Sequence, residues 1–205
     1  MYKDLVDRKG EYNTPKYLFN YLNKHFHFTL DPCSTEDNYL GTKFYMTEKD
    51  DGLNQTWYFV SIFINPPYGK DNERLWIEKA IKEHTKNGST IFLLLPAKTE
   101  ASWYNKLFCM STVIIFPQKR IHFIHKGKKR NGNNIGSIIF GLIKRYNDIN
   151  GKIPNQDTVN KLEEFFKQND EFDIPMDIYE DKIIAFPDRK VLEKNYLSTL
   201  TCHTK

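Results

Sequence analysis

A strand–helix–strand pattern between residues 59 and 95 constrains the fold more than any other feature of the sequence. Phe59 to Asn65 is a continuous apolar run that stops at Pro66-Pro67, which is typical of a strand buried on both faces. Apolar side chains at helical spacing follow, from Asp71 or Asn72 to about Lys86. Thr90 to Leu95 is a second buried run. Two buried strands joined by a helix predict an α/β sheet with parallel strands.

Further elements extend this pattern on both sides. Thr14-Pro15 predicts a helix start, with threonine as the cap and proline in the first helical position. Phe26 to Asp31 alternates between apolar and polar residues, which predicts a strand. The remaining expected elements are a short strand at Lys43 to Met46, a helix over residues 100–110 and a strand at Val113 to Phe116.

The pattern changes after residue 120. Ile121 to Ile124 and Ser137 to Ile143 resemble two strands with no helix between them, which predicts a long hairpin. The fold class expected is therefore an α/β open sheet, mostly parallel, with one antiparallel strand at or near an edge.

Charge divides the chain into a basic body and an acidic tail. From Asp148 onward there are 8 basic and 12 acidic residues, and the rest of the chain has 22 basic and 14 acidic residues. We expect one domain over residues 1–146 and a small acidic extension over 147–205 that packs on it. In the extension we expect a helix at Val159 to Phe166 and a strand at Lys182 to Phe186. The basic body is compatible with a polyanionic partner.

Cysteine usage and hydropathy exclude several classes of protein. Cys33, Cys109 and Cys202 are far apart, so neither a disulfide framework nor a metal-ligand spacing is visible, and we expect no metal. No apolar run reaches the roughly 18 residues that a membrane span needs, and the first residues lack the apolar core of a signal peptide. We therefore expect a cytoplasmic protein without a membrane partner.

Asn65-Pro66-Pro67-Tyr68 follows the first buried strand, at the sheet edge where ligands bind in open α/β folds. These residue types suit the methylation of an amine on a planar group such as adenine. That amine is a poor nucleophile because its lone pair is delocalised into the ring. Two hydrogen-bond acceptors favour the pyramidal nitrogen that can attack, and the Asn65 side-chain oxygen and the Pro66 carbonyl can supply them.

The other residues of this turn fit the same chemistry. Each proline fixes its own φ and pushes the residue before it toward extended geometry, so the acceptors are held rigidly. Tyr68 offers a flat face on which a base can stack. The alternative is a rigid strand-ending turn in which the tyrosine simply packs.

Over residues 11–143 the chain resembles the phage-type DNA N6-adenine methyltransferases. The segments that carry the resemblance are, in order, Tyr12-Asn13-Thr14-Pro15, Phe28 to Cys33, Asp51-Gly52-Leu53 followed by Trp57, Asn65 to Tyr68, Leu95-Pro96 and Arg120 to Phe123. The resemblance implies a Rossmann-like methyltransferase fold, S-adenosylmethionine as cofactor and a short recognition sequence in double-stranded DNA. It also implies a host-cell location if a phage encodes the protein, and a setting such as restriction–modification.

The resemblance also implies the cofactor site. It assigns cofactor contacts to Tyr12, Thr14, Pro15, Asp31, Pro32, Cys33, Asp51 and Gly52. The loop at Asp31 lacks the glycines usual in methyltransferases, and only 34 positions separate Asp31 from Asn65. Complete strand–helix units of about 30 residues each do not fit there, so the cofactor half of the sheet is expected to be abbreviated.

The acidic residues after this loop leave several assignments open. Asp51 is expected to bind the adenine amine of the cofactor. Glu48 and Asp50 remain rivals for the ribose hydroxyls. Alternatively, this stretch is a solvated acidic turn.

A basic segment predicts the DNA contact. Its cations are Lys119, Arg120, Lys126, Lys128, Lys129 and Arg130, with no acidic residue among them. Lysines can follow phosphates, although a solvated loop is the alternative interpretation. The target base would be swung out of the duplex, with Tyr68 on one face. Phe123 would lie on the other face, or would belong to the core.

The resulting hypothesis is an adenine-specific DNA methyltransferase that acts as a monomer or weak homodimer. One alternative enzyme uses the same turn on an RNA adenine, a guanine amine or a protein amide. The other alternative is a catalytically silent nucleic-acid-binding module.

Overall fold

The computed structural model describes residues 12–58, 61–69, 71–117, 120–129, 135–143, 176–179 and 182–185. The helices of this part are α1 (Lys16–Phe26), the 3-10 helix η1 (Glu48–Asp50), α2 (Asn72–Asn87) and α3 (Tyr104–Met110). The strands are β1 (Leu30–Asp31), β2 (Phe44–Tyr45), β3 (Ser61–Ile64), β4 (Thr90–Pro96), β5 (Val113–Ile115), β6 (Ile124–His125), β7 (Lys128–Lys129), β8 (Ser137–Leu142), β9 (Met176–Tyr179) and β10 (Lys182–Ala185).

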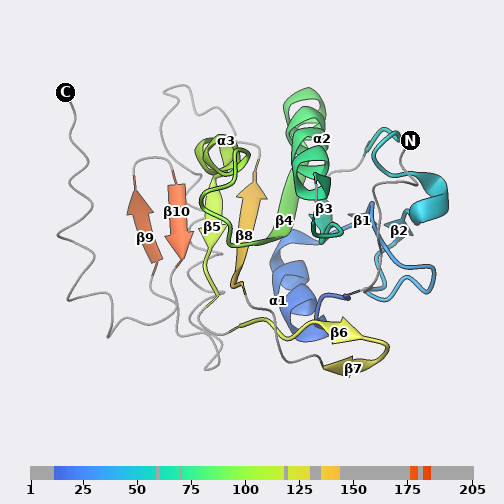
Figure 1. Cartoon of the computed structure of the whole chain (residues 1–205). Helices are drawn as coiled ribbons and strands as arrows, with labels where there is room; N and C mark the ends of the chain where they lie inside the picture. Colours follow the sequence, from blue (N-terminus) through green and yellow to red (C-terminus); the bar gives the residue numbers. More distant parts are fainter. Residues whose placement is uncertain are drawn as a thin grey trace, which may run out of the picture.

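The described strands form one main sheet in the order β2-β1-β3-β4-β8-β5-β10-β9 (Figure 1). Strands β1 to β5 and β10 run parallel to one another, which confirms a mostly parallel α/β sheet. The expected antiparallel strand is β8, but it lies inside the sheet between β4 and β5 rather than at an edge. Strand β9 is also antiparallel, to β10.

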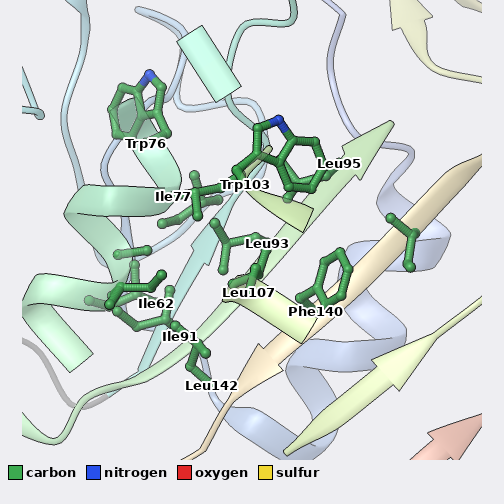
Figure 2. Packing of buried hydrophobic residues seen from close by; sticks show 14 of the residues in the cluster. Ile62, Trp76, Ile77, Ile91, Leu93, Leu95, Trp103, Leu107, Phe140 and Leu142 are labelled. Carbon is green, nitrogen blue, oxygen red and sulfur yellow. The ribbon is translucent and has the colours of Figure 1, made fainter. Parts of the chain in front are cut away.

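Helices cover both faces of the sheet because side chains alternate along each buried strand. Phe63 of β3 packs with Leu18 and Leu22 of α1 on one face. Ile62 of the same strand packs with Ile77 of α2 on the other face, where α3 also contributes Leu107. Figure 2 shows this second cluster, with Trp76 and Trp103 at its border. The sheet is therefore the middle of three layers.

The segment from Thr14 to Asp31 differs from the expectation in two ways. Helix α1 is confirmed, but Pro15 is its N-cap, and no side chain caps it, so Thr14 is not a capping residue. The helix continues to Phe26 and ends at His27 in the left-handed conformation, with φ 48°. The expected strand over Phe26 to Asp31 therefore shortens to β1. Phe26 belongs to the helix, and its spacing to the next phenylalanine imitated strand alternation.

The expected pairing of Ile121–Ile124 with Ser137–Ile143 is wrong. Strand β6 pairs instead with β7, as a separate two-stranded sheet, through the turn Lys126-Gly127. Both turn residues have positive φ, 48° and 73°, which allows a tight two-residue reversal. Strand β8 is therefore not part of this hairpin and joins the main sheet.

The acidic extension contributes β9 and β10, and β10 pairs with β5 in parallel. The strand expected at Lys182 to Phe186 is thus confirmed as β10. The helix expected at Val159 to Phe166 lies outside the described residues. Among the helices that are described, none is both long and apolar enough to span a membrane.

Candidate active site

The carboxyl ends of β1 and β3 bring the two central sequence motifs together. Both strands are parallel and adjacent, so the segments that follow them leave the same edge of the sheet. Cys33, after β1, donates its thiol to the main-chain oxygen of Asn65, after β3, at 3.3 Å. The expected cofactor loop and the expected catalytic turn are therefore in direct contact.

Asn65 has its side chain oriented by a distant segment. Its Nδ2 donates a hydrogen bond to the main-chain oxygen of Tyr12 at 3.0 Å. The two polar atoms of an amide point in different directions, so this bond directs Oδ1 away from Tyr12 as an acceptor. Pro66 is buried and extends the rigid turn. The geometry leaves Asn65 Oδ1 available to a donor at the sheet edge.

Tyr68 is half-buried, and its hydroxyl lies at the buried end of the side chain. The hydroxyl donates to the main-chain oxygen of Leu94 in β4 at 3.2 Å. Burial, and then the electrostatic influence of the nearby Glu73 and Cys33 side chains, raises the pKa of Tyr68 well above its usual value of 10.0. The phenol therefore stays neutral, and its hydrogen bond fixes the ring.

Phe123 lies beside Tyr68, but not as the second face of an open slot. The ring centroids are 6.0 Å apart and the planes are at 89°, so the rings meet edge to face. Phe123 is only 2% exposed and packs in the core cluster that contains α1. A base inserted between the two rings would first have to separate them. As placed here, Phe123 supports the ring of Tyr68.

A buried ion pair that the sequence analysis missed lies next to the turn. Lys98 Nζ is 2.7 Å from Oε1 of Glu73, whose side chain is 2% exposed. Glu73 is in the first turn of α2, and Lys98 follows β4. In the sequence, Glu73 follows the Asn65 to Tyr68 turn and Lys98 follows Leu95-Pro96, so both lie just after a motif. Charged residues near turns are common, however, so this placement did not distinguish the pair.

The loop after β1 is organised by Asp31. Its Oδ1 accepts a hydrogen bond from the main-chain N–H of Cys33 at 3.1 Å, and the thiol of Cys33 lies 3.7 Å from the same oxygen as an alternative to its bond with Asn65. Burial raises the pKa of Asp31 to about 7, and its hydrogen bonds with Cys33 and Ser34 oppose that rise. A carboxyl group thus shapes this loop, which contains no glycine.

The Asp51-Gly52 turn packs directly against that loop. A Cβ placed on Gly52 would be 2.1 Å from the main-chain oxygen of Pro32, so only glycine fits. The indole N–H of Trp57 donates a hydrogen bond to the main-chain oxygen of Gly52 at 2.9 Å, which helps to fix the turn. Asp51 and Pro32, expected to contact the same cofactor, are therefore brought to one place.

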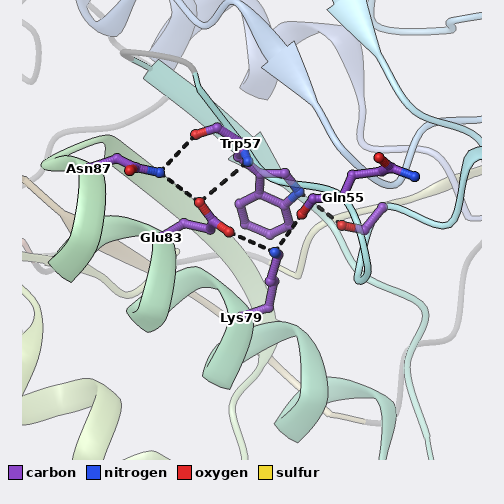
Figure 3. Close-up of polar contacts among 6 residues, drawn as sticks. Gln55, Trp57, Lys79, Glu83 and Asn87 are labelled. Carbon is purple, nitrogen blue, oxygen red and sulfur yellow. Dashed lines mark hydrogen bonds and ion pairs between the residues drawn. The ribbon is translucent and has the colours of Figure 1, made fainter.

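Trp57 is in turn held by α2 (Figure 3). The carboxylate of Glu83 accepts hydrogen bonds from the main-chain N–H of Trp57 at 3.3 Å, from Lys79 Nζ at 2.6 Å and from Asn87 Nδ2 at 2.7 Å. The side chain of Glu83 is 3% exposed, and Lys79 supplies the positive charge that pairs with it. This network anchors the Asp51-Gly52 turn to a rigid helix.

Two buried oxygen atoms near these loops have no hydrogen-bond partner within the described part of the chain. They are Thr14 Oγ1 and Asp51 Oδ1. The other oxygen of Asp51 accepts from Asn54 at 2.6 Å. Ser61 Oγ and Trp76 Nε1 are also buried without a partner in the described part of the chain, so the missing partners alone do not mark a binding site.

The rival acidic residues differ in their surroundings. Asp50 accepts hydrogen bonds from the main-chain N–H and the hydroxyl of Thr47, both at 2.8 Å. These two bonds lower the pKa of Asp50 below its usual value. Asp50 therefore caps η1, and both Asp50 and Glu48 are exposed.

The basic segment forms the β6–β7 hairpin beside α1 (Figure 1). Arg120, Lys126, Lys128 and Lys129 are all exposed. Lys119 and Arg130 lie outside the described residues. Within the ranges that the structure describes, no group of three potential metal ligands is present.

The geometry and the order of these motifs agree with a comparison against known families. The sequence model of the DNA N-6-adenine-methyltransferase (Dam) family matches residues 3–169. The chain belongs to this family. A Dam-family relative, the DNA N-6-adenine-methyltransferase of Escherichia phage T1, is 28% identical over 149 residues. The match covers 63% of this chain and 60% of the phage protein, so it spans less than two thirds of that relative. The resemblance expected from the motifs is confirmed.

Proposed function

We propose that the chain is a DNA methyltransferase that transfers a methyl group from S-adenosylmethionine to the exocyclic amine of a flipped-out adenine. The observation that carries this proposal is the amide of Asn65, held by Tyr12 with its oxygen available at the sheet edge. Membership of the Dam family supports adenine in DNA over the alternatives with the same turn.

The catalytic role of the turn is to bind the amine by its hydrogens. Asn65 Oδ1 and the Pro66 carbonyl accept the two N–H groups, which directs the nitrogen lone pair toward the methyl group. The new bond joins nitrogen to carbon as the carbon–sulfur bond breaks. The nitrogen then loses one proton to water, so no strong base is needed. Rigid prolines keep both acceptors in place before the substrate binds.

The residues around the Asp31 loop fit S-adenosylmethionine. When bound, this cofactor supplies an electrophilic methyl group on a positively charged sulfur. Thr14 Oγ1 and Asp51 Oδ1 are buried oxygens without partners, and Gly52 allows the two loops to meet closely. We propose that Asp51 binds the cofactor's adenine amine. Tyr12, Thr14 and Pro15 would hold its methionine end, while Asp31, Pro32 and Cys33 would form the wall of the site.

Tyr68 and the hairpin would bind the DNA. The neutral, fixed ring of Tyr68 would offer one face to the flipped base, and Phe123 packs against the same ring edge to face. The exposed cations Lys126, Lys128 and Lys129, with Arg120, would contact phosphates. Lys119 and Arg130 would extend this phosphate contact.

The proposal has consequences for the whole chain. The methyltransferase domain would comprise residues 1–146, and residues 147–205 would pack on it. The whole protein would act as a monomer or weak homodimer. The pairing of β10 with β5 supports that packing. A DNA substrate would place the protein in the cytoplasm, or in that of the host if a phage encodes it. Labelled methyl transfer, with DNA and RNA offered side by side, tests the proposed function.

A further inference from the structure

Residues 12 and 13 form a link between the basic hairpin and the catalytic turn. Asn13 exchanges two main-chain hydrogen bonds with Ile124 of β6, at 2.8 Å and 2.9 Å. This bridge adds Asn13 to the hairpin in the manner of an antiparallel strand. The position of the neighbouring Tyr12 is therefore set by the hairpin.

Side chains reinforce the same link. The ring of Tyr12 packs against the ring of His125, with centroids 5.3 Å apart and planes at 36°. His125 is the last residue of β6, directly before the Lys126-Gly127 turn. Tyr12 thus contacts the hairpin through its ring and Asn65 through its main-chain oxygen.

We propose that Tyr12 is a positioning residue, through which the β6–β7 hairpin holds the amide of Asn65 in its catalytic orientation. This inference rests on the proposed function, since it takes Asn65 as the acceptor of the amine and the hairpin as the DNA contact. If the hairpin shifts, the carbonyl that accepts Asn65 Nδ2 shifts with it. A displacement of about 1 Å in a catalytic group can cost roughly 100-fold in rate.

The link also connects DNA binding by the hairpin with the orientation of the catalytic amide. Phosphate contacts on Lys126 or Lys128 would fix the hairpin, and the fixed hairpin would fix Tyr12. The orientation of Asn65 would then be most restricted when DNA is bound. DNA binding would therefore place the Asn65 amide in the orientation that methyl transfer requires.

The test separates this role from direct cofactor binding by Tyr12. The variants are Tyr12→Ala, His125→Ala and the double variant, each with the main-chain carbonyl of residue 12 retained. Single-turnover methyl transfer is measured with DNA and S-adenosylmethionine both saturating, alongside the dissociation constants of both. Tyr58→Ala is the matched control, because the Tyr58 side chain is 77% exposed.

Each single variant is expected to slow methyl transfer by roughly tenfold, and the double variant by about the same factor, because both changes remove one shared contact. Binding of S-adenosylmethionine by His125→Ala should stay within about twofold of the unmodified chain, because His125 is not among the proposed cofactor contacts, and Tyr58→Ala should be unaffected. Unchanged rates in the single variants, or effects that multiply in the double variant, would overturn the inference. Slower methyl transfer in Tyr12→Ala with an unchanged rate in His125→Ala would leave Tyr12 as a cofactor contact only and would also overturn the inference.

Hydrogen exchange gives a readout that does not depend on activity. The amide hydrogens of Asn13 and Ile124 should exchange faster in His125→Ala than in the unmodified chain. Unchanged exchange would show that the ring pair does not hold the bridge. If Asn65→Ala retained activity, the proposed function would fail, yet these exchange rates would still report whether the hairpin holds Tyr12.

Discussion

The side-chain amide of Asn65 donates a hydrogen bond to the main-chain carbonyl of Tyr12, 53 positions earlier in the chain, at 3.0 Å. The orientation of the proposed catalytic amide therefore depends on a segment that is not part of the turn itself. An asparagine at this place can bind both a structural acceptor and a substrate amine, because its amide has a donor and an acceptor end.

Replacing Asn65 with alanine removes one of the two proposed acceptors. We expect Asn65→Ala to slow methyl transfer by at least about 100-fold, as the loss of one preorganised polar group in other active sites does. Binding of S-adenosylmethionine, measured by calorimetry, should change little. Asn105→Ala, at an exposed position of α3, is the control for the same change of side chain. An active Asn65→Ala enzyme is incompatible with the proposed role.

Removing charge from the hairpin tests the DNA contact. A variant with Lys126, Lys128 and Lys129 all changed to alanine should bind DNA more weakly. Its logarithmic salt dependence should also flatten, by up to about 0.9 for each phosphate contact that is lost. The matched control changes Lys82, Lys86 and Lys106, which are exposed on α2 and α3. Equal losses in the two triple variants would show that only net charge matters.

Gly52→Ala tests the contact between the two loops proposed to bind the cofactor. The added Cβ would be 2.1 Å from the Pro32 main-chain oxygen, so one loop has to move. We expect a loss of about 1–3 kcal/mol in the free energy of unfolding, typical of overpacking, together with weaker S-adenosylmethionine binding. In the control Gly136→Ala, the nearest atom is 3.9 Å away. Equal cofactor affinity in both variants would place the cofactor elsewhere.

The raised pKa of Asp31, about 7, predicts how stability depends on pH. The pKa of an aspartate in the unfolded chain is about 3.9. Between about pH 3.9 and 7, the folded state therefore binds more protons at Asp31 than the unfolded state does. The contribution of Asp31 to stability should therefore fall as pH rises from about 4 to 7, by an amount on the order of 4 kcal/mol, and should then level off.

Chemical denaturation of the cofactor-free protein across this pH range measures the effect. Asp31→Asn cannot ionise, so its curve should lack this fall. Asp71→Asn, at an exposed position, should keep it. Parallel curves for the Asp31 variant and the unmodified chain would mean that Asp31 does not carry the pH dependence.

Much of the sheet could be predicted from local patterns. The runs that became β3 and β4, with α2 between them, showed burial and helical spacing clearly, because each element is continuous in sequence. Thr14 was wrongly predicted to cap α1, because the direction of a threonine side chain depends on the tertiary structure around it and not on its place before a helix. Phe26 was misassigned because its spacing satisfies both helix and strand.

The hairpin shows what local patterns do not contain. The Lys126-Gly127 turn was a visible signal, since glycine readily takes positive φ, but lysine at 48° is unusual. The partner of β8 could not be inferred, because strand order is set by packing over the whole sheet. Likewise, nothing near Asn65 in sequence indicates that its side chain binds Tyr12. The motif residues were predictable, and the contacts that orient them were not.

The most direct test offers double-stranded DNA and RNA side by side to the full chain with methyl-labelled S-adenosylmethionine, followed by nucleoside analysis of both products. The account predicts labelled N6-methyladenine in DNA and none in RNA, with the signal lost in Asn65→Ala. Label found only in RNA, on another nucleoside or on protein would contradict it, as would the absence of any transfer.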